Sequence, residues 1–251
     1  MGIAWFLPRR DRRGACFELS RMIPLRDENP SSTVPVVTRT IIVLNCLVFV
    51  YEIMLGEGLR PFMFQWGLVP ERLTLALRYH EEPVVTAGVT LVTSMFLHGG
   101  WLHLLGNMWY LSIFGDNIED RLGKARYLLF YLLIGALAGT MHYLVNPSSR
   151  LPTVGASGAI AGVLGAYAVT FPRARVITLL PLFPFFQVVA LRAVWALGLW
   201  FVFQFFSGAL SLGIGNAGGT AWWAHIGGFV IGAVTMKLMT LGRAPSRVLV
   251  E

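Results

Sequence analysis

Residues 155–171 read GASGAIAGVLGAYAVTF, and residues 222–241 read WWAHIGGFVIGAVTMKLMTL. A helix needs about 20 mostly apolar residues to cross the hydrocarbon core of a bilayer, and both stretches come close to that length. Each also carries two glycines spaced four apart, Gly158 and Gly162 in the first and Gly228 and Gly232 in the second. Small residues at this spacing let helix backbones approach each other in lipid. We therefore expect these two helices to contact each other.

The rest of the chain holds four more apolar stretches. Together the six predicted spans are centred near residues 37–55, 96–115, 127–145, 156–171, 188–206 and 222–241. Of the 251 residues, 55% are apolar and only 13% are charged, whereas about a quarter are charged in soluble proteins. The sequence predicts an all-α, six-helix membrane bundle over residues 36–241, between an N-terminal segment, 1–35, and a short tail, 242–251.

The distribution of basic residues predicts the orientation of this bundle. If six helices begin and end on one side, that side holds 16 of the 20 basic residues: Arg9, Arg10, Arg12, Arg13, Arg21, Arg26, Arg39, Arg121, Lys124, Arg126, Arg173, Arg175, Arg192, Lys237, Arg243 and Arg247. Only Arg60, Arg72, Arg78 and Arg150 remain on the other side. By the positive-inside rule, both termini are expected in the cytoplasm. Because the charge lies beside the spans, we expect a lipid bilayer and not a nucleic acid as its partner.

Two regions fit this pattern less simply. Residues 56–95 form a long outer segment, which is expected to lie partly in the membrane interface. The apolar stretch 84–97 is too short to span the membrane, so we interpret it as a lead-in to the second span. Pro181 and Pro184 interrupt the run before the fifth span. We place both prolines in an inner loop and expect Arg192 to snorkel from the fifth span to the inner surface.

Few polar side chains lie within the predicted spans, and such side chains mark function or interhelical hydrogen bonds. His103 and Asn107 share one face of the second span. Ser157 opens the fourth span, and His225 lies near the start of the sixth. Each alone has a simpler interpretation, such as helix packing or a bond to its own helix. However, these three spans all run from outside to inside, so the four residues share one outer layer, and this convergence favours a site.

The residue types predict acyl transfer. A serine hydroxyl becomes a good nucleophile when a neighbouring base takes its proton, and histidine is the usual base near neutral pH. Backbone N–H groups at the start of the Ser157 helix, with His103 and Asn107, could stabilise an oxyanion. No carboxylate is placed to complete a triad. An intramembrane aspartyl protease is excluded because Asp116, Glu119 and Asp120 cluster at the inner end of the second span, and the H-E-x-x-H zinc motif is absent.

These motifs resemble those of the rhomboid family of intramembrane serine proteases. HGGWLHLLGNMWYL carries its H-x-x-x-N as His103 and Asn107, GASG carries its G-x-S-G serine, and AHIGGFVIG carries A-H-x-x-G-x-x-x-G with His225. IEDRLG is similar to the family's E-x-R pair. The resemblance implies Ser157 as nucleophile, His225 as base, and His103, Asn107 and the Ser157 backbone N–H as oxyanion hole. It implies structural roles near the site for these residues: Gly155, Gly158, His98, Gly228 and Gly232.

The resemblance also implies a site without cofactor or metal, in a cavity open to the outer side, and single-pass membrane proteins as substrates. The chain departs from some relatives in two features: its long outer loop lacks their Trp-Arg pair, and one position near the expected base differs. They carry a tyrosine that stacks on the catalytic imidazole, and this chain has Ala161 there. The rival hypothesis is a catalytically inert rhomboid-like protein that binds membrane clients. Such a protein is expected to lack the serine or the histidine, and this chain has both.

Overall fold

The computed structural model describes residues 22–182, 185–214 and 221–241. The N-terminal segment up to residue 21, the tail 242–251 and Pro184 lie outside the described residues. The elements follow in this order: β1 (Ile23–Asp27), α1 (Val36–Met54), η3 (Gly56–Gly58), α2 (Leu59–Trp66), α3 (Pro70–Thr74), η4 (Leu75–Tyr79), α4 (Val84–Thr93), η5 (Ser94–Phe96), α5 (Trp101–Leu122), α6 (Lys124–Val145), α7 (Ser157–Thr170), β2 (Arg175–Leu182), β3 (Phe185–Arg192), α8 (Ala193–Ile214) and α9 (Trp222–Thr240).

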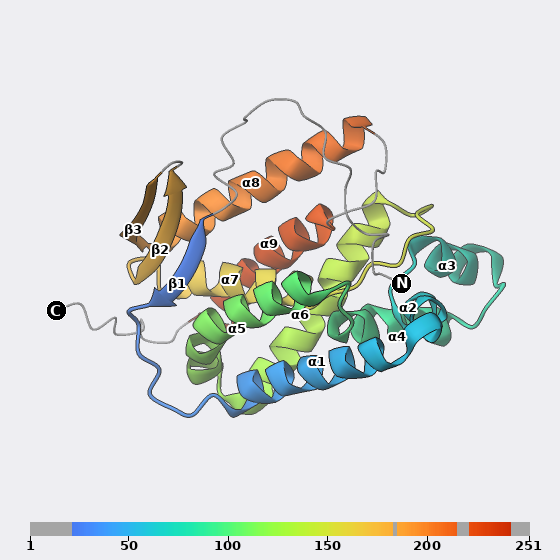
Figure 1. Ribbon diagram of the computed structural model, residues 1–251, viewed down its shortest axis with the longest axis horizontal. Coiled ribbons are helices and arrows are strands. Elements are labelled where there is room, and N and C mark those ends of the chain that lie inside the picture. Colours follow the sequence, from blue (N-terminus) through green and yellow to red (C-terminus); the bar gives the residue numbers. More distant parts are fainter. Residues whose placement is uncertain (1–21, 183–184, 215–220, 242–251) are drawn as a thin grey trace.

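The fold is mainly helical, as predicted, and α7 occupies its centre (Figure 1). Every residue of α7 from Gly158 to Tyr167 is buried, which is the expected environment for a helix that is apolar on all sides. Helices α5, α6, α8 and α9 all pack against α7. The short helices α2, α3 and α4 lie at one end of the bundle and the strands at the other (Figure 1). A single central helix therefore contacts most of the elements that build the site.

Among the described residues, three helices are by themselves long and apolar enough to cross a membrane: α1, α6 and the segment Ala193–Ser211 of α8. The lead-in helix α4, extended to Phe96, meets α5 at a bend of 81°, and the pair counts as a fourth span if it is one broken span. Helix α7 has only 14 residues and is too short by the same measure. The chain is thus a helical membrane protein, and the count of six spans stays a prediction.

The predicted fifth span differs from the structure at its start. Residues Phe185–Arg192 form strand β3, and the helix begins only at Ala193. Pro181 lies in β2 rather than in a loop, and Arg192 pairs with Arg175 at the open end of the β2–β3 hairpin instead of lying inside a helix. The cause is local: these segments are rich in β-branched and aromatic residues, which favour strands, and proline is excluded from helix interiors. The result is a three-stranded antiparallel sheet in the order β1-β2-β3.

Hydrogen bonds from strand β1 hold the start of the described chain against α5 and α7. Its Asp27 accepts a hydrogen bond from the Tyr167 hydroxyl of α7 at 2.5 Å and one from the Asn117 amide of α5 at 3.1 Å. Farther along, the Glu119 carboxylate of α5 accepts hydrogen bonds from the backbone N–H groups of Val37 and Thr38. Those groups open α1, where they lack partners within the helix and where a negative charge is favourable.

Asp27 makes the stability of this junction depend on pH. Burial raises the pKa of its carboxyl to about 6, against the lowering effect of the Tyr167 hydrogen bond. The folded protein therefore binds a proton that the unfolded chain releases near pH 4, so stability is lost as pH rises from about 4 through 6. We expect Asp27→Asn, which keeps an oxygen acceptor for Tyr167, to remove that loss. Thermal melting in detergent should show a stability advantage of the variant that grows from pH 5 to pH 7 and then levels off. A constant difference across this range would contradict the assignment.

Candidate active site

Ser157 and His225 meet at the N-terminal end of the central helix α7. Ser157 is the first residue of α7, and His225 lies in the first turn of α9. The Ser157 Oγ and the His225 Nε2 are 2.7 Å apart, which is a hydrogen-bond distance. His225 is only 9% exposed. Two residues 68 positions apart in the chain are thus held in contact inside the protein.

Glycines bring the two helices together. The backbone of Gly228 lies against the carbonyl oxygen of Gly158, and Gly232 lies against the backbone of Gly162, so closely that a methyl group at either position of α9 would collide with α7. One turn further along α7, Gly165 meets the carbonyl of Phe229 in the same way. Because these contacts are between backbones, they leave little freedom for α9 to slide or turn against α7. The distance between Ser157 and His225 depends on them.

His103 and Asn107, one turn apart on α5, lie beside the serine. A methyl group built on Gly155 would be 2.6 Å from the His103 Nε2 and 3.7 Å from the Asn107 Nδ2. Gly155 also has φ of +124°, which residues with a side chain rarely adopt. Only glycine therefore lets the segment before Ser157 pass this close to α5.

Hydrogen bonds indicate which atoms of these two residues can donate to a ligand. The Gly99 N–H donates to the His103 Nδ1 at 3.3 Å, so a neutral His103 carries its proton on Nε2, the atom that faces Gly155. The Asn107 amide donates one N–H to the carbonyl of His103 at 3.0 Å and has a second one for another acceptor. Two side-chain donors are therefore available next to Ser157.

His98 lies behind this layer. It is 1% exposed, its ring centroid is 5.2 Å from that of His103, and its backbone N–H donates to the buried Glu52 carboxylate of α1. The structure thus brings all the predicted site residues, including Gly155, Gly158, Gly228 and Gly232, into one region.

A cavity of about 30 Å³ borders the serine. Its lining includes Ser94, Gly155, Ser157, Gly158 and Ala224. This volume has room for about two water molecules, and carbonyl and hydroxyl groups can bind them. The arrangement can therefore supply a nucleophile, a base, oxyanion donors and water, which are the parts that hydrolysis through an acyl intermediate needs. No cluster of three or more metal-binding side chains occurs among the residues described.

Sequence reasoning missed one residue of this site. Gln204 of α8 contacts the Nδ1 of His225 through its Oε1 at 2.7 Å. The sequence did hold a signal for Gln204, which is a polar residue between Phe203 and Phe205 in a largely apolar helix. Such residues are expected to contact protein rather than lipid. The sequence did not indicate which side chain Gln204 would contact.

Comparison with known proteins gives one consistent family. A model of the Rhomboid domain matches residues 86–241. The chain is 36% identical over 134 residues to presenilin-associated rhomboid-like protein A, mitochondrial, of Danio rerio, which covers 51% of this chain and 35% of that protein. It is 42% identical over 77 residues to YdcA of Bacillus subtilis, named as a candidate rhomboid protease, covering 31% and 38%. Rhomboid protein 1, mitochondrial, of Saccharomyces cerevisiae is 34% identical over 102 residues, covering 39% and 29%. The chain thus spans only about a third of the length of these relatives.

Proposed function

The chain belongs to the rhomboid family, and from this premise we propose that it is an intramembrane serine endopeptidase that cleaves single-pass membrane proteins within or beside their transmembrane segments. The observation that carries the proposal is the 2.7 Å contact between the Ser157 Oγ and the His225 Nε2 in a buried layer. An inert client-binding protein has no need to hold a serine and a histidine in this geometry. Some relatives are named rhomboid-like proteins rather than proteases, so activity needs a direct test.

In the proposed mechanism, His225 takes the proton of Ser157 as the Oγ attacks a peptide carbonyl carbon. The carbonyl oxygen becomes an oxyanion, and the Nε2–H of His103, the free N–H of Asn107 and the backbone N–H of Ser157 are positioned to stabilise it. The C–N bond then breaks, and His225 gives its proton to the leaving amine. A water from the adjoining cavity hydrolyses the acyl-serine by the same steps. We propose that this chemistry needs no metal or cofactor.

The test compares membrane fragments that active cells and Ser157→Ala cells release. Products present only with the active protein, each ending within or next to a predicted transmembrane segment, would support the proposal and identify substrates. Ser157→Ala must accumulate to the same level and melt at the same temperature for the comparison to hold. If the two fragment sets are the same, and purified protein cleaves none of the membrane proteins offered to it, the inert client-binding function is favoured.

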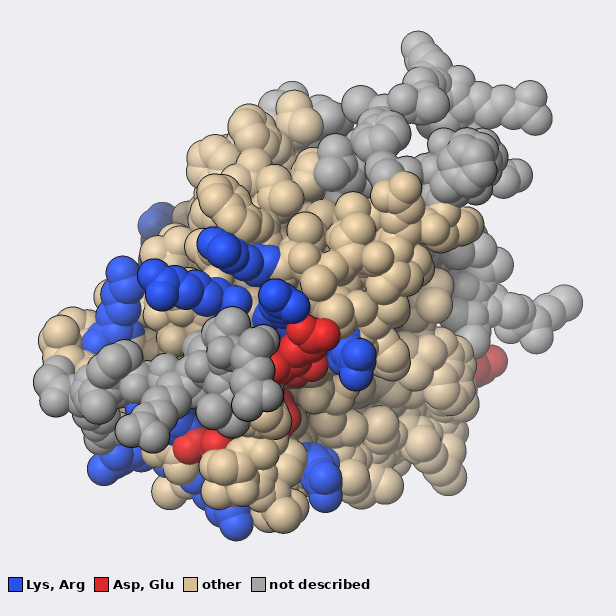
Figure 2. Space-filling view, turned by 90° about the vertical axis from the view of Figure 1, so that its left-hand side faces the viewer, with Lys and Arg blue, Asp and Glu red and all other residues tan. Residues whose placement is uncertain are grey.

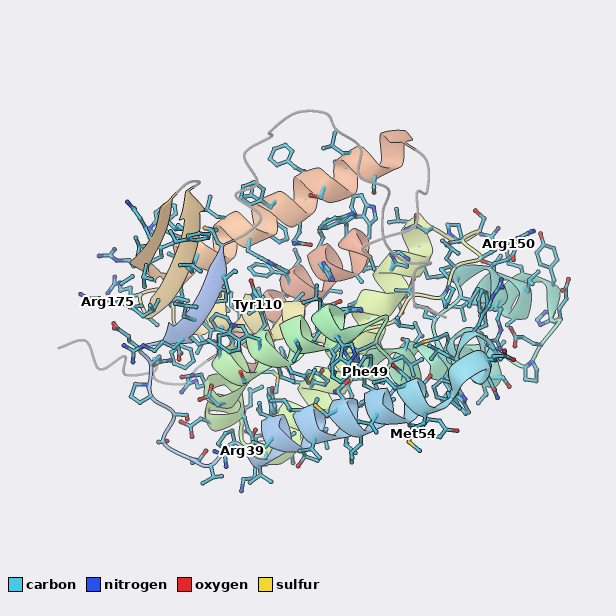
Figure 3. The ribbon with its side chains drawn as sticks, in the orientation of Figure 1. Arg39, Phe49, Met54, Tyr110, Arg150 and Arg175 are labelled. Carbon is cyan, nitrogen blue, oxygen red and sulfur yellow. The ribbon has the colours of Figure 1, made fainter. Side chains whose placement is uncertain are left out.

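We further propose that the protein lies in a plasma membrane with its site toward the outer side. Basic residues gather on the face that carries the sheet (Figure 2). Arg39 and Arg175 lie at this end, and Arg150 lies at the opposite end (Figure 3). The positive-inside rule then predicts a cytoplasmic sheet and an outward Ser157. The relatives reported above include two mitochondrial proteins, so the identity of the membrane is part of the proposal.

An epitope tag at the C-terminus tests this orientation. We expect the tag to resist protease added to intact cells and to be digested only after the membrane is opened. A second tag in the segment 80–83, between η4 and α4, is expected to be digested from outside and serves as the matched control. A C-terminal tag that is cut in intact cells would reverse α9 and move His225 to the cytoplasmic half.

A further inference from the structure

The base has a second hydrogen bond on the side away from the serine. The Nδ1 of His225 lies 2.7 Å from the Oε1 of Gln204, which α8 contributes at mid-length. Its Nε2 lies 2.7 Å from the Ser157 Oγ, so both ring nitrogens have partners. The three side chains come from three separate helices, α7, α8 and α9. They form a continuous chain of hydrogen bonds that runs from serine through histidine to glutamine.

The amide oxygen of Gln204 determines which atom donates in each of these hydrogen bonds. The Oε1 can only accept a hydrogen bond, so the Nδ1 of His225 must carry the proton in its neutral form. The Nε2 then has a free lone pair, and that is the atom that must take the proton of Ser157. With the other tautomer, Nε2 would present a proton to the serine and could not act as base. The Gln204 carbonyl therefore selects the reactive tautomer.

Among the described residues, few other groups near His225 could perform this task. Ala161, the position where some relatives are expected to stack a tyrosine on the imidazole, offers only a methyl group. Trp200, one turn before Gln204 on α8, and Trp222 have ring centroids 6.1 and 6.3 Å from the imidazole. These rings limit the space around His225, but an indole N–H is only a donor and cannot replace an acceptor at Nδ1.

We propose that Gln204 is a positioning residue that holds His225 in the tautomer and orientation needed to activate Ser157. This inference rests on the proposed protease function and deepens it. The role corresponds to that of the aspartate in a Ser-His-Asp triad, which fixes the tautomer of the histidine. A neutral amide performs it without adding a charge to the site. Gln204 also makes the reactivity of the base depend on where α8 lies.

The experiment follows the rate at which a fluorophosphonate labels Ser157 in the purified full chain, as a function of pH. Gln204→Met has similar length but no carbonyl acceptor, and we expect labelling and the kcat of cleavage to fall about tenfold, with little change in KM. Gln204→Glu restores the acceptor and adds a negative charge that holds a proton on the imidazole. It is expected to keep most of the maximal rate while the acidic limb of the profile moves to higher pH. Gln187→Met, the same change on the exposed strand β3, is the control and should match the original chain.

A direct view of the tautomer comes from ¹⁵N NMR of protein labelled at histidine. We expect the His225 imidazole, identified by the signal that His225→Ala lacks, to carry its proton on Nδ1 in the original chain and to lose that signature in Gln204→Met. If Gln204→Met labels at the original rate, or if the acidic limb of folded Gln204→Glu does not move, the positioning role is wrong. The Glu variant decides the matter should the Met variant fail to fold. A folded original chain that is not labelled at any pH would instead contradict the protease function.

Discussion

Labelling of Ser157 by a fluorophosphonate is expected to fall by at least about 10³ when His225 is replaced by alanine, and to disappear when Ser157 is replaced by alanine. In soluble serine proteases, loss of either member of the pair lowers kcat by about 10⁶, since the two act as a unit. Here the base and the nucleophile are 2.7 Å apart, so His225 is in direct contact with the hydroxyl that must lose its proton. Removal of His225 therefore leaves only slow attack by an unactivated hydroxyl.

Gel fluorescence of the purified protein over time gives the labelling rates directly. The control is His80→Ala, because His80 lies in the connection between η4 and α4, away from the site, and this variant should label at the original rate. A chelator should leave all rates unchanged if no metal takes part. Rapid labelling that survives in His225→Ala would require a different base, and labelling that survives in Ser157→Ala would place the nucleophile elsewhere.

A methyl group at Gly232 is expected to damage both stability and activity. Gly232 lies two turns beyond His225 on α9, so the change does not touch the imidazole, but the added carbon would collide with the backbone of Gly162. Backbone atoms cannot rotate away, so the cost should be at the upper end for overpacking, about 3 kcal/mol. For a chain of this size that corresponds to a melting temperature lower by about 10 °C. Separation of α7 and α9 would also lengthen the contact between Ser157 and His225 and lower the rate of cleavage.

Gly198→Ala on α8 is the matched control, since a methyl group there meets no neighbouring atom within 4 Å. It should melt at the original temperature or slightly above, because alanine favours a helix more than glycine does. Thermal unfolding in one detergent compares the three proteins. Equal melting temperatures for Gly232→Ala and the original chain would show that α7 and α9 can move apart easily, contrary to the close backbone packing.

The helices of the site could be predicted because their signals are local. Glycine spacing, apolar length and the first polar residue of each span are all readable in a short window, and the structure begins α7 at Ser157 and α9 at Trp222, close to the expected positions. Gln204 could not be assigned a role in the same way. A single amide in an apolar helix has many possible partners, and only the packing of α8 against α9 selects His225.

The sheet could not be predicted either, because its strands pair across a long separation in sequence. From sequence alone, residues 175–192 are expected to form a loop and the start of a span, because their apolar content fits both a strand and a buried helix. Its pairing partner β1 lies in the polar N-terminal part of the chain, far away in sequence. The hydrogen bond between Asp27 and Tyr167 joins positions 140 residues apart. Such contacts depend on the assembled bundle, and no local pattern indicates them.

The position of β1 also determines the order in which the molecule can assemble. Ile23 pairs with Leu179, so the first strand must wait for about 150 further residues before its partner exists. At synthesis rates of about 5–20 residues per second, that wait lasts about 8–30 s. During this time α1 is already made, while the carboxylate of Glu119 that caps Val37 and Thr38 arrives only with α5. The newly made protein therefore passes through a stage in which its first helix exists without its Glu119 partner, and the sheet can form only after α7 has been made.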